Sequence, residues 1–193
     1  MYYRNMLQSE NSSSADNQQE RSKEFLRGYV CGLVDGEGSF HIAFAIRKDL
    51  PLGMSVIPEF HVSQNFQSRN VLELVEKILG CGYIKPNHRN SKDETFVYVV
   101  RDRADLITKV IPFFEFNHLL TSKKLDFKIF YSVVRIICSG RHRTSVGMAE
   151  IIKLAYKMNA GGKRRIRKKE ELLALLKSST TTCQTPNKVS EKI

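Results

Sequence analysis

The spacing of apolar residues changes from a helical period to a period of two at Gly38. Between Lys23 and Val34 the apolar residues recur at helical spacing, and Ser22 is a candidate N-cap. From Ser39 to Arg47 apolar and polar or small residues alternate, as in a strand with one buried face. A helix that leads directly into a strand limits the fold to classes that mix both elements.

The same change of period occurs a second time further along the chain. A second strand is predicted at 54–64, where Pro58 indicates a sheet edge or a bulge. The remaining predicted elements are a helix at 70–79, strands at 83–87 and 95–101, and helices at 103–110, 122–138, 146–159 and 170–177, with a break at Pro112. This order predicts an α+β fold, in which a four-stranded antiparallel sheet carries helices on one face (an αββαββα core).

The length of 193 residues suits one domain of about 150 residues with tails. Residues 1–22 and 178–193 are polar and are expected to be disordered, which leaves a single domain at 23–177. No apolar run approaches the roughly 20 residues that cross a bilayer, so a soluble protein without a membrane partner is expected. The four cysteines lack Cys-x-x-Cys or Cys/His spacing, and free thiols are expected.

The chain carries a formal net charge of +11, which favours polyanionic partners through release of their counterions. The charge is clustered, since six of the seven residues in "KRRIRKK", 163–169, are cationic. Lys163, Arg164, Arg165 and Arg167 are therefore candidates for contacts with phosphates. A nuclear localisation signal or a solvated tail is the alternative interpretation of this run.

The face of the predicted sheet that helices leave open is polar. Two-stranded ribbons fit the major groove of DNA, and side chains of these types can bind base edges. The alternative is an ordinary solvated sheet face. The candidate DNA-binding residues on it are His41, Arg47, Glu59, His61, Lys85, Asn87 and Thr95.

The first helix has a ridge of small residues. Gly28 and Gly32 lie four apart, and Cys31 lies beside the second. Each interior glycine costs about 1 kcal/mol relative to alanine, so close packing against another helix is expected to offset it. The alternative is a loosely packed helix within one monomer.

The nine residues "VCGLVDGEG", 30–38, resemble the LAGLIDADG signature of homing endonucleases. Gly32, Leu33, Asp35 and Gly38 are identical to the signature, and the other positions hold similar or small residues. The order of elements, "PEFHVSQ" at the end of the second strand and "VIPFF" before a long helix extend the resemblance to about residues 23–160.

The resemblance implies a role for each matching residue. Glu37 would bind a divalent metal, with the carbonyl of Gly36 as a second ligand, and Mg²⁺ is expected, with Mn²⁺ able to substitute. Gln64 would orient the attacking water, and Lys123, or else Lys124, would complete the catalytic pocket. The motif helices of two copies would pack together through Gly28, Cys31, Gly32 and Asp35, and Asp35 is expected to serve structurally at the helix end.

Only one copy of the motif occurs, so a double-strand break would need a homodimer. The resemblance therefore implies a homing DNA endonuclease, intron-encoded, that cuts duplex DNA at a long pseudo-palindromic site. An RNA maturase that assists intron splicing, with RNA as its partner, and a non-cleaving DNA-binding regulator are the alternatives. By family habit an organelle, chloroplast or mitochondrion, is the expected location, with a bacterial cytoplasm as the other option.

Overall fold

The computed structural model describes the backbone of residues 3–87, 94–159 and 165–182 and the side chains of residues 18–87, 94–159 and 165–176. In chain order its elements are α1 (Tyr3–Glu37), β1 (Gly38–Ile46), β2 (Met54–Asn65), η1 (Phe66–Ser68), α2 (Arg69–Leu79), β3 (Tyr83–Pro86), β4 (Thr95–Val100), α3 (Arg103–Asp105), η2 (Leu106–Val110), α4 (Ile111–Phe116), α5 (Lys123–Cys138), η3 (Arg141–Arg143), α6 (Ser145–Ala155) and α7 (Lys169–Thr182). The predicted strands and the predicted α+β class are confirmed.

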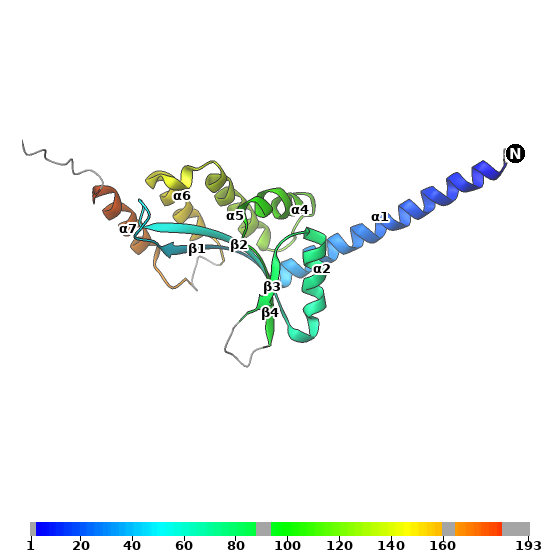
Figure 1. Cartoon of the computed structure of the whole chain (residues 1–193), viewed down its shortest axis with the longest axis horizontal. Coiled ribbons are helices and arrows are strands. Elements are labelled where there is room, and N and C mark those ends of the chain that lie inside the picture. The colour runs from blue at the N-terminus through cyan, green and yellow to red at the C-terminus, as the bar shows by residue number, and fades with distance from the viewer. Residues whose placement is uncertain (1–2, 88–93, 160–164, 183–193) are drawn as a thin grey trace, which may run out of the picture.

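The four strands form one antiparallel sheet in the order β1-β2-β4-β3. Figure 1 shows α4, α5 and α6 along one side of β1 and β2, which leaves the other side of these strands open. Pro58 pairs with Ile42 of β1, and β2 gains its second neighbour, β4, only from Phe60 onward. The edge position expected for this proline is therefore confirmed, because one side of β2 is unpaired there.

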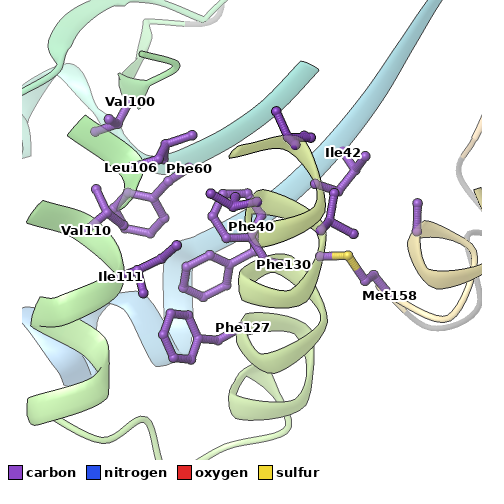
Figure 2. Close-up of a cluster of buried hydrophobic side chains, with 14 of the residues drawn as sticks. Phe40, Ile42, Phe60, Val100, Leu106, Val110, Ile111, Phe127, Phe130 and Met158 are labelled. Carbon is purple, nitrogen blue, oxygen red and sulfur yellow. The ribbon is translucent and has the colours of Figure 1, made fainter. Parts of the chain in front are cut away.

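An aromatic cluster joins the sheet to its helical layer. The ring of Phe40 in β1 lies 5.2 Å from that of Phe60 in β2, and 5.3 Å from those of Phe127 and Phe130 in α5. Figure 2 shows these rings converging beside Ile111 of α4. Aromatic pairs at such separations add about 0.5–1.5 kcal/mol each beyond the burial of their surface. The cluster therefore fixes the beginning of β1, and with it the end of α1, against α5.

Both predicted tails are shorter in the structure than expected. Helix α1 begins at Tyr3, so residues 3–22 are helical rather than disordered, and Ser22 lies inside the helix instead of at its N-cap. No Gly or Pro occurs between Tyr3 and Arg27, so no residue of these types interrupts the helix. At the other end α7 continues to Thr182, while 183–193 lie outside the described residues.

The predicted break at Pro112 is wrong, because the backbone stays helical from Arg103 to Phe116. Residues Leu106–Val110 form a π-helical turn that continues into α4, where Pro112 lies in the first turn. A proline is tolerated there because its missing N–H removes no required bond and a wider turn precedes its ring.

Cys31, Cys81 and Cys138 are free thiols, as expected, and Cys183 lies outside the described residues. Within the described part of the chain, none of the helices combines the length and the apolar character needed to cross a membrane.

Candidate active site and nucleic-acid interface

Helix α1 passes into β1 without a loop, and this junction forms an acidic corner at residues 35–37. A Cβ atom on Gly38 would lie 2.5 Å from Cγ1 and 2.7 Å from the carbonyl oxygen of Val34, so only glycine fits there. Gly36 and Glu37 remain exposed at the junction. The turn therefore presents the Glu37 carboxylate to solvent at the end of the sheet.

Asp35, two residues before Glu37, is engaged inside the chain. Its carboxylate accepts hydrogen bonds from the backbone N–H groups of Leu120 (2.8 Å) and Thr121 (3.1 Å) and from the Thr121 hydroxyl (2.7 Å). Burial alone would raise the pKa of Asp35, but the hydrogen bonds from Thr121 and Leu120 and the charge of Lys123 outweigh it and lower the pKa. These hydrogen bonds tie the segment before α5 to the end of α1.

This attachment brings Lys123 to the acidic corner. The Lys123 ammonium donates to the Gly36 carbonyl oxygen across 3.5 Å. Of the two candidate lysines, Lys123 is half-buried beside the corner, whereas Lys124 is exposed at the next position of α5. The Lys123 ammonium thus lies at the carbonyl of the residue that precedes Glu37.

Gln64 lies at the same end of the sheet. The ladder pairs Gly38 with Val62, so Gln64 is two residues further along β2 in the direction of the α1 terminus. The side chain is half-buried, and the residue pairs with Phe96 of β4. Its expected role in orienting water remains a prediction.

The ligands for a metal ion at the acidic corner are few in one chain. The Glu37 carboxylate and the Gly36 carbonyl are hard oxygen ligands of the kind that Mg²⁺ prefers, and both residues are exposed. Among the described residues, no group of three or more His, Cys, Asp and Glu side chains could hold a metal ion. These two oxygens suit a hard divalent cation, which would need its other ligands from outside the chain.

The open face of the sheet contains a row of ionisable side chains centred on Glu59, which also includes His41, His61 and Arg101 and is called the ionisable row below. His41 pairs with Glu59 across β1 and β2, and the β2–β4 register places Arg101, which follows β4, opposite Glu59 on the other side. Glu59 is only 6% exposed, its carboxylate forms an ion pair with Nε of Arg101, and Nε2 of His61 lies 2.9 Å from its other oxygen. The direct contact with DNA expected for Glu59 does not fit this burial.

The charges around Glu59 determine its protonation. Burial alone would raise the pKa of Glu59, but the neighbouring His61 and Arg101 outweigh burial and hold the pKa below its ordinary value. The pKa of His41 is also lowered, first by burial and then by the charges of Arg165 and His61. Glu59 is therefore a buried anion, and His41 is disfavoured as a cation.

The other candidates on this face remain accessible. Lys85 and Asn87 are exposed, and Thr95 is half-buried. Arg47 makes a bidentate pair with Asp49 at 2.9 and 2.7 Å, and both side chains are exposed. Exposed pairs of this kind contribute little to stability, so Arg47 can exchange Asp49 for a phosphate at little cost.

The residues of the basic run at 163–169 differ in whether their side chains are available for phosphate. Lys163 and Arg164 lie outside the described residues, and Arg167 is exposed. The phosphate contact expected for Arg165 does not fit the structure, because its Nη1 donates to the Ile42 carbonyl (2.6 Å) and its Nη2 to the Ala155 carbonyl (3.1 Å).

Arg165 therefore protects the free edge of β1. Nδ2 of Asn159 donates to the Phe40 carbonyl at 3.1 Å, two residues along the same edge. Side-chain donors thus cover carbonyls that would otherwise be available for pairing with another strand.

The glycine ridge of α1 has no neighbour within the described residues of the chain. A Cβ atom added to Gly28, Gly32 or Gly36 would meet no atom within 4 Å. Phe25, Phe116 and Leu120, beside the ridge, are 72%, 76% and 83% exposed.

Cys31 is buried against the rest of the chain, where its thiol donates to the Asn117 carbonyl at 3.4 Å. Its contact is therefore internal, and the exposed face consists of glycines and large apolar side chains.

Sequence reasoning missed Arg101, Phe116 and Leu120. The alternation of the strand at 95–101 puts Arg101 on the same face as Thr95, and this signal could have identified it. The exposure of Phe116 and Leu120 had no comparable signal, because it depends on how residues 117–121 attach to Cys31 and Asp35.

Residues 30–134 match the family model described as LAGLIDADG endonuclease. The homing endonuclease I-ApeII of Aeropyrum pernix is 28% identical over 155 residues, which cover 78% of this chain and 90% of the relative. A relative from Mycosarcoma maydis, named probable intron-encoded DNA endonuclease 1, is 35% identical over 96 residues, and the match spans about a third (32%) of its length. Among solved structures, the archaeal intron-encoded homing endonuclease I-Vdi141I, complexed with DNA, superposes with a TM-score of 0.74 at 27% identity over 82% of this chain and 98% of that one.

Proposed function

The chain belongs to the LAGLIDADG endonuclease family, and we propose that it is a site-specific homing DNA endonuclease that hydrolyses a phosphodiester bond in each strand of a duplex. The observation that carries this proposal is the acidic corner, where Glu37 is exposed and the Lys123 ammonium donates to the carbonyl of the preceding residue, Gly36. The names of the relatives from Aeropyrum pernix and Mycosarcoma maydis, and the DNA complex of I-Vdi141I, support DNA as the substrate and an intron as the location of the gene.

A homodimer would supply one acidic corner for each DNA strand. Three glycines with open space around them are costly in a helix, at about 1 kcal/mol each, and nothing among the described residues of one chain offsets that cost. Packing α1 against the same helix of a second copy would offset it and would also cover Phe25, Phe116 and Leu120. Such an interface has two-fold symmetry, which predicts a target with two related half-sites.

In this proposal Glu37 and the Gly36 carbonyl hold a divalent ion, expected to be Mg²⁺ with Mn²⁺ as a substitute. When bound, such an ion activates water and stabilises the leaving oxygen of an in-line displacement. Gln64 orients the attacking water from the adjacent end of β2. Lys123 adds positive charge where negative charge develops on the scissile phosphate. Asp35 keeps Lys123 in place by holding Leu120 and Thr121.

Cleavage by Glu37→Gln tests the proposal. The DNA that flanks the reading frame, joined across the intron, serves as the candidate target and is incubated with protein and Mg²⁺. The variant keeps the size of the side chain and loses its charge, so cutting should fall by about 10³-fold or more while binding stays nearly unchanged. Glu150→Gln, which removes the charge of a half-buried carboxylate that pairs with Arg141 on the surface of α6, is the control and should cut normally.

Unchanged cutting by Glu37→Gln would refute the metal role of this residue. Specific binding without cutting by the unaltered protein would favour a DNA-binding regulator. Binding restricted to the intron RNA would favour a maturase.

A further inference from the structure

Arg101 and Glu59 form an unusual pair on the open face of the sheet. The Arg101 side chain is half exposed, whereas Glu59 is almost completely buried. A buried ion pair is costly to desolvate, and apolar residues at such positions are often no less stable. The neighbouring β4 residues on this face, Val97 and Val99, show that apolar side chains are accommodated there. Stability alone therefore does not explain the pair.

The geometry of the pair leaves the recognition edge of Arg101 available. Glu59 engages the Nε atom of the guanidinium, and the second carboxylate oxygen lies 2.9 Å from His61 Nε2. An arginine has five N–H donors, and four of them lie on the two terminal nitrogens. One terminal nitrogen shares the edge of Nε, but the outer edge, formed by the two terminal nitrogens, is turned away from the carboxylate that Nε contacts and can pair with a ligand. His61, at the other oxygen of Glu59, helps to hold the carboxylate in place.

We propose that Arg101 reads a guanine in each half of the DNA target and that Glu59 is the residue that positions it. This inference rests on the proposed function, since it assumes that the open face of the sheet lies in the major groove. Guanine presents two acceptors there, O6 and N7, and a paired arrangement of arginine N–H groups is their commonest specific partner. Glu59 makes no contact with DNA and acts only through Arg101.

The position of the row limits where this guanine lies. His41, which pairs with Glu59, is three residues from Gly38 at the acidic corner. At ~3.3 Å per residue this is about 10 Å along β1. The guanine is therefore expected within about half a helical turn of the cut bond, at equivalent positions in both half-sites.

The test is a binding selection from a pool of duplexes with a randomised 30-base-pair segment, done without divalent metal so that cleavage is not required. The unaltered protein should enrich guanine at one position per half-site, with a preference of roughly 5- to 150-fold over other bases. Arg101→Gln should lose this preference and favour adenine at the same position, because glutamine pairs with adenine N6 and N7.

Glu59→Gln should weaken the guanine preference at that position alone, at least about 5-fold, while leaving the rest of the profile intact. Asp49→Asn is the matched control, because it removes the acid from an exposed arginine pair on the same sheet and should leave this position unchanged. The double variant Glu59→Gln/Arg101→Gln should give the same profile as Arg101→Gln, since Glu59 acts through Arg101. A thermal melt of each variant shows whether the selection reports on folded protein. If Glu59→Gln does not fold, Arg101→Gln still tests whether Arg101 reads the guanine, because the Arg101 side chain is half exposed and its replacement should leave the fold intact.

Two results would overturn the inference. An Arg101→Gln variant that loses affinity equally for all sequences would make Arg101 a phosphate contact, and an unchanged profile would remove it from the interface. Either result differs from failure of the proposed function, in which the unaltered protein would enrich no sequence or, if it is a regulator, would enrich a sequence that it does not cut when Mg²⁺ is added.

Discussion

The acidic corner and the ionisable row differ in whether the residues of one chain supply all the partners of their charged groups. In the row, Glu59 is buried and both of its oxygens have partners from the same chain. At the corner, only Asp35 is satisfied internally, while Glu37 is exposed and the adjacent glycine face of α1 meets nothing within the described residues. One region is therefore finished on folding, whereas the other, in the proposed function, acquires its remaining partners from a second chain, a metal and DNA.

The difference also concerns the sign of the charge that is offered to solvent. Each region has one acid held inside the chain, Asp35 or Glu59. Beside Asp35 the exposed group is the Glu37 carboxylate, which suits a cation, and beside Glu59 it is the Arg101 guanidinium, which suits the acceptors of a base. An engaged acid thus lies beside an exposed charged side chain in both places, and we propose that this exposed side chain carries the chemistry at the corner and the recognition in the row.

After Glu37→Gln, the largest effect is expected from Gly32→Leu, which blocks the exposed glycine face of α1 beside the corner. The new side chain would prevent a second α1 from approaching, so the protein should become monomeric and cleavage should fall by more than about 10²-fold. The fold of one chain has room for it, and the helix of that chain should gain up to about 1 kcal/mol. Sedimentation equilibrium and single-turnover cleavage measure the two effects.

Ala174→Leu, at an exposed position of α7, is the control and should leave both measurements unchanged. A Gly32→Leu variant that remains dimeric would move the interface away from the glycine ridge.

The next effect separates Lys123 from Lys124. Lys123→Met should lower the cleavage rate by about 10²-fold, because it removes a positive charge from the acidic corner while keeping the bulk of the side chain. Lys124→Met loses the same charge at the exposed neighbouring position and should change the rate by less than about 3-fold. Single-turnover rates at saturating protein give the comparison, and equal losses in both variants would reduce the role of Lys123 to general charge.

A smaller effect on stability is expected from Asp35→Asn. The substitution weakens three hydrogen bonds to a charged carboxylate that joins α1 to residues 120 and 121. Because the site is only partly buried, the free energy of unfolding should fall by about 1–2 kcal/mol. Urea denaturation measures this change. Glu37→Gln serves as the control at the same corner, and a loss as large as that of Asp35→Asn would show that Glu37 is also structural.

The sequence predicted the corner better than the row, for a physical reason. Asp35, Gly36 and Glu37 are consecutive, so the change of period at Gly38 was enough to place them at a helix end. Glu59 and Arg101 are 42 positions apart, and only the register of β2 with β4 brings them together. Burial of Glu59 follows from that register and is absent from the alternation of the strand.

The unexpected role of Arg165 also arises from contacts between residues that are far apart in the sequence. The two carbonyls that Arg165 binds lie 123 and 10 residues away along the chain, on β1 and α6, so local charge density could not distinguish it from the exposed Arg167. The class of fold, the strand order along the chain and the position of Lys123 depend on local patterns and on the resemblance, and these were predictable.

Acidification should lower the stability of the fold through His41 in the row at a higher pH than through Asp35 at the corner. This is the smallest of the predicted effects. The pKa of His41 is lowered from 6.5 by burial and by the charges of Arg165 and His61, so the folded state binds fewer protons than the unfolded state just below pH 6.5. Stability therefore falls as the pH drops from 6.5 through the folded pKa of His41. The pKa of Asp35 is lowered from 3.8, so the stability that it contributes persists until the pH falls below about 4. Between pH 7 and 5, the melting temperature of His41→Gln should decline less than that of the unaltered protein. The melting temperature of Asp35→Asn should decline in parallel with that of the unaltered protein. If His41→Gln declines as much as the unaltered protein, another group causes the acid sensitivity.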